Sequence, residues 1–170
     1  MTRFTAPAPT PAVPTAEAFA AFERALHGSG VRAALAYLVS LTRYRFIGIF
    51  RFNDGMANAA VHYDRENPDQ TRIDAVPDTA TYCCFVRDTK GSFTTVDALE
   101  DPRLVGHVKR AVLRAYCGVP VMDAEGQLLG TLCHYDLVPR DADELDMPLL
   151  LQAASALALG GHVPPYPNAA

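Results

Sequence analysis

The chain has 170 residues, of which 49% are apolar, and its 19 acidic and 15 basic residues give a formal net charge of -4. This composition excludes general disorder and suffices for one domain with a sizeable core. The charges are scattered, so no surface for nucleic acid or an anionic membrane is expected. No apolar run approaches the roughly 20 residues that span a bilayer, and no secretion signal precedes the domain. A reducing cytoplasm is therefore the expected location, and the four cysteines are not expected to form a disulfide framework.

The N-terminal part of the chain predicts an arm and two helices. Residues 1–14 are rich in proline and predict a flexible arm. Thr15 is a candidate helix cap, and the apolar residues after it recur at helical spacing until Gly28-Ser29-Gly30 ends the helix. A second helix is predicted from Val31 to about Thr42.

The next part predicts two strands and a long loop. Tyr44 to Phe52 alternates between two faces, and Asn53-Asp54-Gly55 is typical of a turn. Met56 to Tyr63 predicts a short, alanine-rich strand at a sheet edge. Residues 64–77 are polar and irregular, and a loop of this length often acts as a lid.

The middle of the chain predicts two helices separated by a strand and a loop. Thr79 to Lys90 carries one apolar stripe and is predicted to end at Gly91. Phe93 to Val96 predicts a short strand, and residues 97–103 predict a loop. Residues 105–113 are predicted to form a second short helix.

The last part predicts a hairpin and a terminal helix. Arg114 to Met122 and Gln127 to Tyr135 are apolar runs around a short, glycine-containing loop, the pattern of an antiparallel hairpin. Asp141 to Leu159 predicts an amphipathic helix with acidic residues in its first turn, which the helix dipole favours. Gly160-Gly161 is predicted to end it.

Two blocks of this sequence resemble GAF domains. The first, YCGVPVMDAEGQLLGTLCHYDLVPR at residues 116–140, is similar to the C-terminal hairpin of that family. There, a Gly-Val-Pro strand precedes an acidic-glycine turn and then Gly-x-Leu-x-hydrophobic-x-Asp. The second, at residues 95–103, resembles an upstream segment of the family that contains Asp-Ala and Asp-Pro-Arg. The resemblance covers roughly residues 16–159.

This resemblance implies an α+β fold with a central antiparallel sheet of about five or six strands. Terminal helices are expected on one face and a ligand pocket on the other, with the domain at residues 15–160 and a loose tail at 161–170. The implied function is a sensory module for an unidentified small molecule, acting through a partner protein or a homodimer. The residues that suit a dimer through the terminal helices are Leu149, Leu150, Ala153, Ala156 and Leu157.

The resemblance also implies which residues line the pocket. Six are expected to form apolar walls with a few polar tips: Tyr82, Phe85, Val96, Tyr116, Cys133 and Tyr135. The alternative is a closed core, which uses the same residue types. Asp97 and Arg103 are candidates to orient a polar ligand. The alternative is a pair that braces the loop, between Arg103 and either Asp97 or Asp101.

The cysteines invite a redox interpretation beside a purely structural one. Cys83 and Cys84 are neighbours, and a disulfide between neighbours is strained, so two free thiols are expected. If Met122 pairs with Gln127 in the hairpin, Cys117 and Cys133 lie on opposite faces. A slip of one residue would reverse this. Buried free cysteines usually act as small apolar residues.

Two active branches of the GAF family carry cysteines at positions that this sequence does not match, and a third chemistry, haem binding, is raised by the histidines alone. Free methionine-(R)-sulfoxide reductases carry a reactive cysteine in the loop before the penultimate strand, and residues 106–114 contain none. Bilin-binding members carry Cys-His in a helix, whereas Cys133-His134 lies in a predicted strand, so a covalent bilin is not expected. His107 and His134 fall near the expected pocket and are the candidates for haem, although a structural role is the simpler account.

The remaining alternatives are an enzyme and a domain without a ligand. The enzyme would be a thiol reductase that uses Cys83, Cys84 or Cys117. No GxSxG motif, P-loop or dinucleotide-binding fingerprint accompanies these cysteines. The third alternative is a structural or dimerisation domain whose pocket is absent or filled by Tyr116 and Tyr135.

Overall fold

The computed structural model describes residues 13–166, so most of the predicted arm and the end of the predicted tail lie outside the described residues. The helices and strands, in chain order, are α1 (Thr15–Ser29), α2 (Val31–Ser40), β1 (Phe46–Asn53), β2 (Met56–Asp64), β3 (Val76–Pro77), α3 (Cys83–Thr89), β4 (Phe93–Thr95), β5 (Ala115–Met122), β6 (Leu128–Asp136) and α4 (Met147–Leu159). Four short 3-10 turns lie between them: η1 (Asp78–Ala80), η2 (Ala98–Glu100), η3 (Pro102–Leu104) and η4 (Ala142–Glu144).

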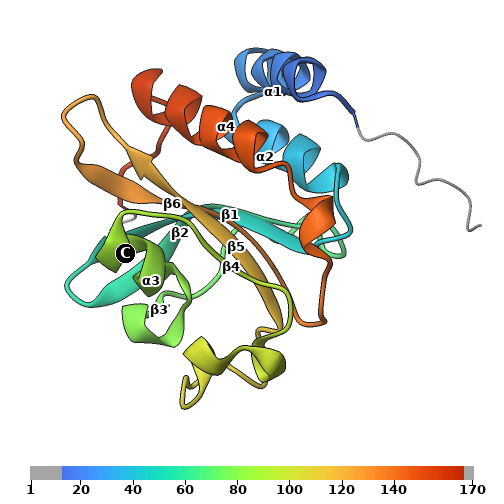
Figure 1. The fold of residues 1–170 in the computed structure, drawn as a ribbon. Helices are drawn as coiled ribbons and strands as arrows, with labels where there is room; N and C mark the ends of the chain where they lie inside the picture. The colour runs from blue at the N-terminus through green and yellow to red at the C-terminus, as the bar shows by residue number, and fades with distance from the viewer. Residues whose placement is uncertain (1–12, 167–170) are drawn as a thin grey trace, which may run out of the picture.

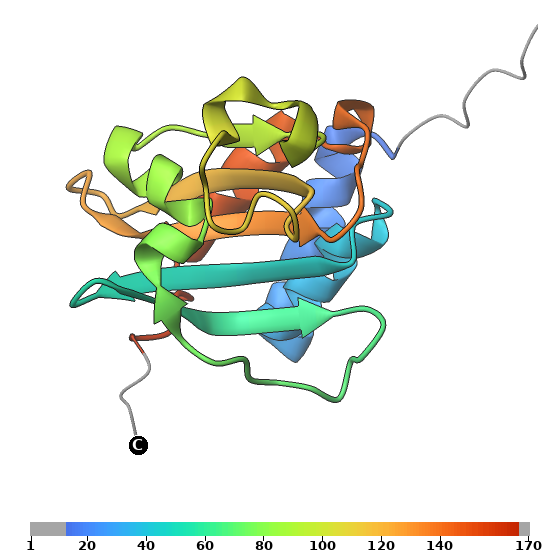
Figure 2. The same ribbon diagram turned by 90° about the horizontal axis from the view of Figure 1, so that it is seen from below.

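The strands form a single six-stranded sheet in the order β3-β2-β1-β6-β5-β4. Every pairing between neighbours is antiparallel. The helices α2 and α4 cover one face, with α1 packed against them on the outside, while α3 and the long loops cover the other face (Figures 1 and 2). The predicted α+β fold is therefore confirmed. Among the described residues, the longest helix has 15 residues and no helix is suited to cross a membrane.

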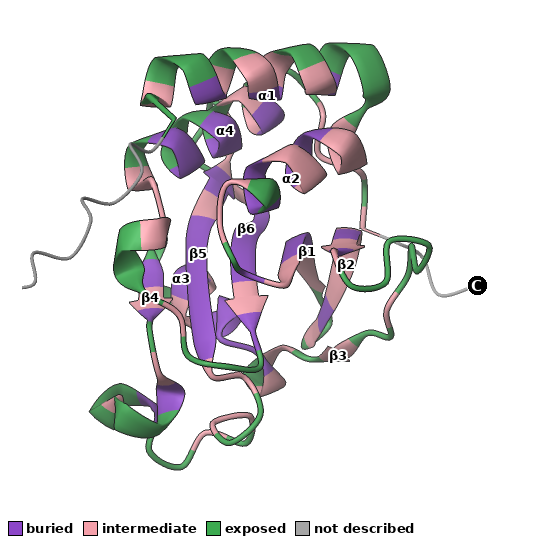
Figure 3. Cartoon of the chain, turned by 90° about the vertical axis from the view of Figure 1, so that its right-hand side faces the viewer, coloured by how far each residue is buried: buried purple, intermediate pink, exposed green. Residues whose placement is uncertain are grey.

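The face under the three helices holds the larger apolar core. Residues at helical spacing on α1, such as Phe22 and Leu26, meet Leu35 and Leu38 of α2 above the strands. Figure 3 shows this burial on the inner sides of the helices and along β5. Of the five residues expected at a dimer interface, four are buried in this core of the monomer: Leu149, Leu150, Ala153 and Leu157. That prediction was wrong about their availability, because helical spacing alone does not distinguish an intramolecular contact from an intermolecular one.

Two predicted helix starts differ from the structure and share a cause. Asp146 accepts a hydrogen bond from the backbone N–H of Leu149 at 3.0 Å, so it caps α4, which begins at Met147 rather than at Asp141. Asp146 also accepts a hydrogen bond from the hydroxyl of Thr15 at 2.6 Å. The Thr15 side chain therefore joins the starts of α1 and α4 and does not cap its own helix.

Two further segments contain less helix than predicted. The helix expected at residues 79–90 is only α3, preceded by η1. It ends at Thr89 and is followed by the C-cap residue Lys90, which has a left-handed backbone with φ of 52°. The helix expected at residues 105–113 is a series of turns, entered through Gly106 at φ of 85°. These short segments pack against other parts of the protein, so local propensity did not decide their form.

The two strands of the hairpin pair in a different register from the predicted one, but their side chains lie on the predicted faces of the sheet. Tyr116 is opposite Tyr135 and Cys117 is opposite His134, and an irregularity between Val121 and Met122 pairs Met122 with Leu128 instead of Gln127. The offset from the predicted register is two residues over most of the ladder, which leaves each side chain on its original face. Cys117 therefore lies in the core under the helices and Cys133 in the opposite cluster, as predicted.

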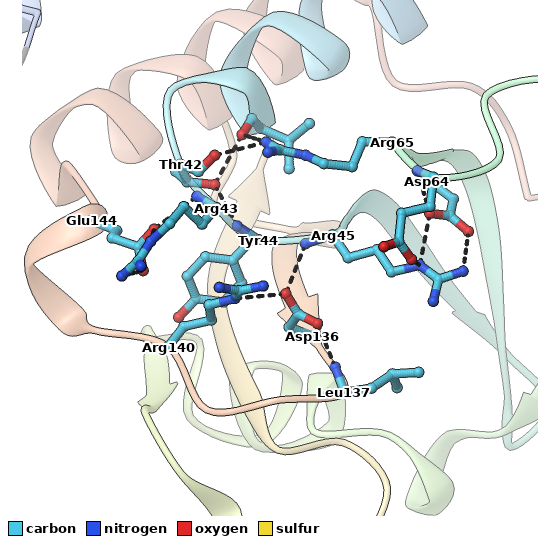
Figure 4. A network of polar contacts seen from close by, with 12 residues as sticks. Thr42, Arg43, Tyr44, Arg45, Asp64, Arg65, Asp136, Leu137, Arg140 and Glu144 are labelled. Carbon is cyan, nitrogen blue, oxygen red and sulfur yellow. Dashed lines mark hydrogen bonds and ion pairs between the residues drawn. The ribbon is translucent and has the colours of Figure 1, made fainter.

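A network of charged groups ties the ends of three strands together (Figure 4). Asp136, at the end of β6, accepts hydrogen bonds from the backbone N–H of Arg45 at 3.0 Å and from Arg140 at 2.8 Å. The guanidinium of Arg45 binds both carboxylate oxygens of Asp64 at 2.9 Å and keeps the pKa of that carboxyl below its usual value. These contacts hold β1, β2 and β6 in register at one end of the sheet.

Candidate functional site

A cavity of about 160 Å³ lies between α3 and the sheet. Its floor is formed by side chains from β1, β5 and β6: Phe50, Tyr116, Cys133 and Tyr135. Its sides come from the segment that leads into α3, from Ile73 and Asp74 of the long loop, and from Lys109, Val112 and Leu113 of the turns before β5. Most of these side chains are apolar, with charges only in the two loops, as in many sites for small molecules.

Four residues predicted to line a pocket do line this cavity: Tyr82, Tyr116, Cys133 and Tyr135. The three tyrosine hydroxyls have partners within the protein. Tyr82 donates to the carbonyl of Leu113 at 2.7 Å, Tyr116 contacts the Cys83 sulfur at 3.2 Å, and Tyr135 contacts Nε2 of His62 at 2.5 Å. Because these polar groups are satisfied, the rings are held in place and present apolar surface to the cavity.

A glycine two residues further along β5 positions Tyr116. A Cβ atom at Gly118 would collide with the hydroxyl end of the Tyr116 ring. The ring can therefore lie across the strand and reach Cys83 only because residue 118 has no side chain. The Gly-Val-Pro run in the sequence thus has a direct role in shaping this wall.

The other five predicted site residues lie outside the cavity lining. Phe85 stacks on Phe93 with ring centroids 4.6 Å apart, and His107 meets the Tyr82 ring edge-on at 4.8 Å. Both support the wall from behind. Val96 is 43% exposed on the surface. A ligand contact by any of these three residues stays a prediction.

Asp97 and Arg103 each form a salt bridge that stabilises the loop in which the residue lies. Asp97 pairs with Arg114 at 2.9 Å, while Arg103 forms a two-pronged contact with Asp101 at 3.0 and 2.7 Å. Hydrogen bonds from Arg103 lower the pKa of Asp101 to about 2. Arg103 also lies over the Phe93 ring at 4.4 Å. The Asp101–Arg103 pair is one of the bracing pairs named as the alternative, and a ligand contact stays a prediction for Asp97 and Arg103.

The comparison with protein families identifies this fold. A model of the GAF domain matches residues 23–160, most of the chain. The chain belongs to the GAF family. No curated protein matches the sequence.

Solved structures share this fold at low sequence identity. The free methionine-R-sulfoxide reductase of Neisseria meningitidis, solved with its substrate, is 16% identical with a TM-score of 0.67, over 93% of this chain and 94% of that one. The GAF domain of an Acinetobacter phosphoenolpyruvate-protein phosphotransferase is 12% identical with a TM-score of 0.67, covering 85% and 90%. The chromophore-binding domain of an unusual bacteriophytochrome, RpBphP3 from R. palustris, is 11% identical with a TM-score of 0.59, covering 83% of this chain and 56% of that one. At these identities the likeness concerns the fold alone.

Several residues of this GAF cavity were missing from the sequence-based prediction. Ile73 and Val76 stand out as large apolar residues in the otherwise polar stretch 64–77, which is a signal that could have been used. Phe50 was placed on the correct face of β1 but was not assigned to the site. Lys109 and Leu113 gave no such signal, because their position depends on turns that were predicted as a helix.

The four cysteines differ in their surroundings. The sulfurs of Cys83 and Cys133 lie 3.9 Å apart, and both residues line the cavity. Cys84 points to the carbonyl of Thr81 at 3.1 Å. Cys117 lies across the sheet, and burial raises its pKa, as it does that of Cys84. The sequence pointed to cysteines in general, and only the fold selects this pair.

Two buried histidines occupy opposite faces of the sheet. His134, a candidate haem ligand expected near the pocket, lies instead under the helices with its ring 5.8 Å from that of Tyr44. That prediction was wrong because its neighbour Cys133 takes the cavity face, and alternate residues of a strand point to opposite sides. His62 is the histidine on the cavity side, through its contact with Tyr135. Burial lowers the pKa of both histidines to about 4.

The long loop beside the cavity is fastened to α2 by two arginines. Arg32 of α2 donates to the carbonyls of His62 at 3.1 Å and Pro68 at 2.5 Å. Arg65, at the start of the loop, donates to the carbonyl of Thr42 at 2.8 Å and to that of Val39 at the end of α2. The loop that carries Ile73 is therefore connected directly to the helical face (Figure 4 shows the Arg65 contacts).

Proposed function

We propose that this GAF domain is a sensory module that binds a small, mainly apolar molecule in the cavity between α3 and the sheet. The observation that carries the proposal is the cavity itself, which has a floor of aromatic side chains and sulfur and sides made of loops. A closed core would leave no such volume, since protein interiors pack densely. The family is one of small-molecule-binding sensory modules, which agrees with this use of the site.

The lining supports a ligand with an apolar body and a polar end. Phe50, Tyr116 and Tyr135 offer ring surfaces with no free charge near them, so a charged group at the floor would be unfavourable. Asp74 and Lys109 carry opposite charges in the two loops that flank the cavity, and either can contact a polar end of the ligand. A small aromatic or branched molecule with one ionised or hydroxyl group fits this arrangement.

The output would travel from the loop to the helices. A ligand in contact with Ile73 stabilises one position of the loop, and Arg32 and Arg65 connect that loop to both ends of α2. Binding then shifts a population between two arrangements of the loop and α2. We propose that a partner protein or a second copy of this chain reads the change at the helical face.

The test is to fill the cavity and ask whether a bound molecule is lost. Ala80 lines the cavity at the end of η1, so the substitution Ala80→Phe places a ring inside it. Native mass spectrometry of the protein purified from its own host should show a bound small molecule in the unchanged protein and none in Ala80→Phe. The matched control is Ala142→Phe, which adds the same ring at an exposed position of another 3-10 turn, η4.

The Ala142→Phe protein should keep the bound mass. A bound molecule that persists in Ala80→Phe would place the binding site elsewhere and contradict the proposal. The absence of any bound molecule, together with no thermal stabilisation by a panel of small aromatic acids, amines and alcohols, would favour a structural domain instead. Circular dichroism of both variants shows whether the added ring leaves the fold intact.

A thiol-dependent reductase is the second candidate, favoured by the position of Cys83 and Cys133 in the cavity wall. A thiolate that attacks the sulfur of a sulfoxide would release the sulfide and leave a sulfenic acid, which a second thiol converts to a disulfide and water. NADPH-coupled reduction of methionine sulfoxide, measured for each cysteine-to-serine variant, tests this. Activity that is equal to background and unchanged across the series would exclude the reductase while leaving the sensor untouched.

A further inference from the structure

Two cysteines that lie 50 positions apart in the sequence meet at the wall of the cavity. Cys83 begins α3 and Cys133 lies near the middle of β6, and their sulfurs are 3.9 Å apart. Both side chains are buried, with exposed fractions of 2% and 0%. Both residues nevertheless border the cavity. The other two cysteines have different partners: Cys84 contacts the carbonyl of Thr81, and Cys117 contacts Thr94 and Met147.

The surroundings make the two sulfurs chemically unequal. Burial by itself would raise the pKa of the Cys83 thiol, but hydrogen bonds from Cys133 and other neighbours, including the Tyr116 hydroxyl, outweigh it and lower that pKa. Burial raises the pKa of Cys133. Of the two sulfurs, Cys83 therefore loses its proton more readily than Cys133. A nucleophilic thiolate beside a protonated thiol is the arrangement that stepwise thiol oxidation uses.

We propose that Cys83 is a modification site for a small hydroperoxide and that Cys133 is the thiol that resolves it. The Cys83 sulfur attacks one peroxide oxygen, the O–O bond breaks, and the leaving oxygen takes a proton; with hydrogen peroxide, the products are the Cys83 sulfenic acid and water. The Cys133 sulfur then attacks the Cys83 sulfur, the S–O bond breaks, and the second oxygen leaves as water with the Cys133 proton. The sum is two thiols and one hydrogen peroxide giving one disulfide and two waters.

This site does not depend on the identity of the proposed ligand. Closing the pair would join α3 to β6 beside the cavity and cross-link two elements that form opposite sides of it. Hydroperoxide would then act at the same wall that the small molecule contacts, so oxidation and binding would compete for one volume. The failure of one proposal leaves the other standing, because mass spectrometry of the thiols and of the bound molecule are separate measurements.

The experiment treats the reduced protein with hydrogen peroxide, denatures it and labels the remaining thiols with N-ethylmaleimide. All four cysteines are free at the start, so four labels are expected before treatment. After treatment, two labels and the loss of two hydrogen atoms are expected, and peptide mapping should identify a link between Cys83 and Cys133. Retention of four labels at a tenfold excess of peroxide, or a link between any other two cysteines, would overturn the proposal.

Variants assign the order of the steps. Cys133→Ser should form no disulfide and should accept dimedone, a reagent for sulfenic acids, at Cys83. Cys83→Ser should accept none at Cys133. The matched controls Cys84→Ser and Cys117→Ser should still lose two hydrogen atoms, since each keeps the pair. A disulfide between Cys83 and another cysteine in Cys133→Ser would contradict the assignment of Cys133 as the resolving thiol. Peptide mapping of the unchanged protein decides the matter even if a variant fails to fold.

Discussion

The two faces of the sheet are covered by different kinds of side chain. Under α1, α2 and α4 lies a continuous core of aliphatic side chains and a few rings, with residues such as Phe22, Leu35 and Leu157 fully buried. On the α3 face the cluster is smaller, consists mainly of aromatic rings and sulfur, and borders a cavity. The first arrangement holds most of the buried aliphatic groups, whereas the second places aromatic rings and sulfurs at the wall of the cavity beside α3.

This difference separates stability from function. The helical face is formed by long elements that bury many apolar groups, so it should unfold only with the whole domain. The cavity face is closed by short turns and a long loop whose positions depend on a few side-chain contacts. Such segments open at low cost in free energy, which suits a binding site. Three changes can test the comparison.

The largest expected effect is on the helical face. Phe22→Ala removes a ring that is 0% exposed, and should lower the free energy of unfolding by about 3–5 kcal/mol. The matched change on the cavity face, Ile73→Ala, removes a half-buried side chain from a loop and should cost less than about 1.5 kcal/mol. Urea unfolding of both variants provides the measurement. Equal losses would mean that the two faces contribute alike and would break the comparison.

The second effect depends on pH and should involve both faces equally. His134 and His62 have a native pKa of about 4 against 6.5 in the unfolded chain, so the unfolded state binds more protons between these values. Stability is therefore complete above pH 6.5 and is lost as the pH falls toward 4, by up to about 3 kcal/mol for each histidine.

NMR titration of the two imidazole rings checks this directly. His62→Gln and His134→Gln assign the signals, and each should make the unfolding free energy less dependent on pH in that window. A histidine that titrates near pH 6.5 in the folded protein would show that its side chain is less buried than the structure indicates. If that histidine were His134, its burial between the sheet and the helices would be in doubt.

The smallest expected effect on global stability concerns the link between the faces. Arg32→Met removes the hydrogen bonds to the loop and should cost about 1–2 kcal/mol, because their carbonyl acceptors are partly exposed to water. Hydrogen exchange of residues 66–75 should accelerate more than exchange in β1 or β5. The control Arg24→Met changes an exposed arginine of α1 and should leave the loop as it is. If hydrogen exchange of residues 66–75 accelerated equally in both variants, Arg32 would not be the residue that connects the loop to α2.

Much of the fold was predictable because it rests on local patterns. The alternation in β1 assigned Phe50 and Ile49 to opposite faces, and the glycine at position 126, with φ of 75°, marked the hairpin turn. A hairpin register that was wrong by two residues still placed Cys117 and Cys133 correctly, because facing repeats every second residue. The long helices were also recognisable, since their apolar spacing extends over several turns.

The site was predictable only in part. Four of the predicted residues line the cavity, namely Tyr82, Tyr116, Cys133 and Tyr135. Phe85 is also aromatic, but it packs behind the cavity wall against Phe93. Apolar character predicts that a side chain avoids water, and it does not say whether that side chain fills a core or borders a void.

The sequence by itself therefore pointed to the family through the resemblance of two motif blocks at residues 95–103 and 116–140. It also determined the hairpin strands and the face on which each strand residue lies, because these follow from periodicity along the chain. Only the tertiary structure decided which side chains enclose the cavity, where α4 begins, and that Cys83 meets Cys133. Those features depend on contacts between segments that are distant in the sequence, and their free energy comes from packing and hydrogen bonds that no local pattern records.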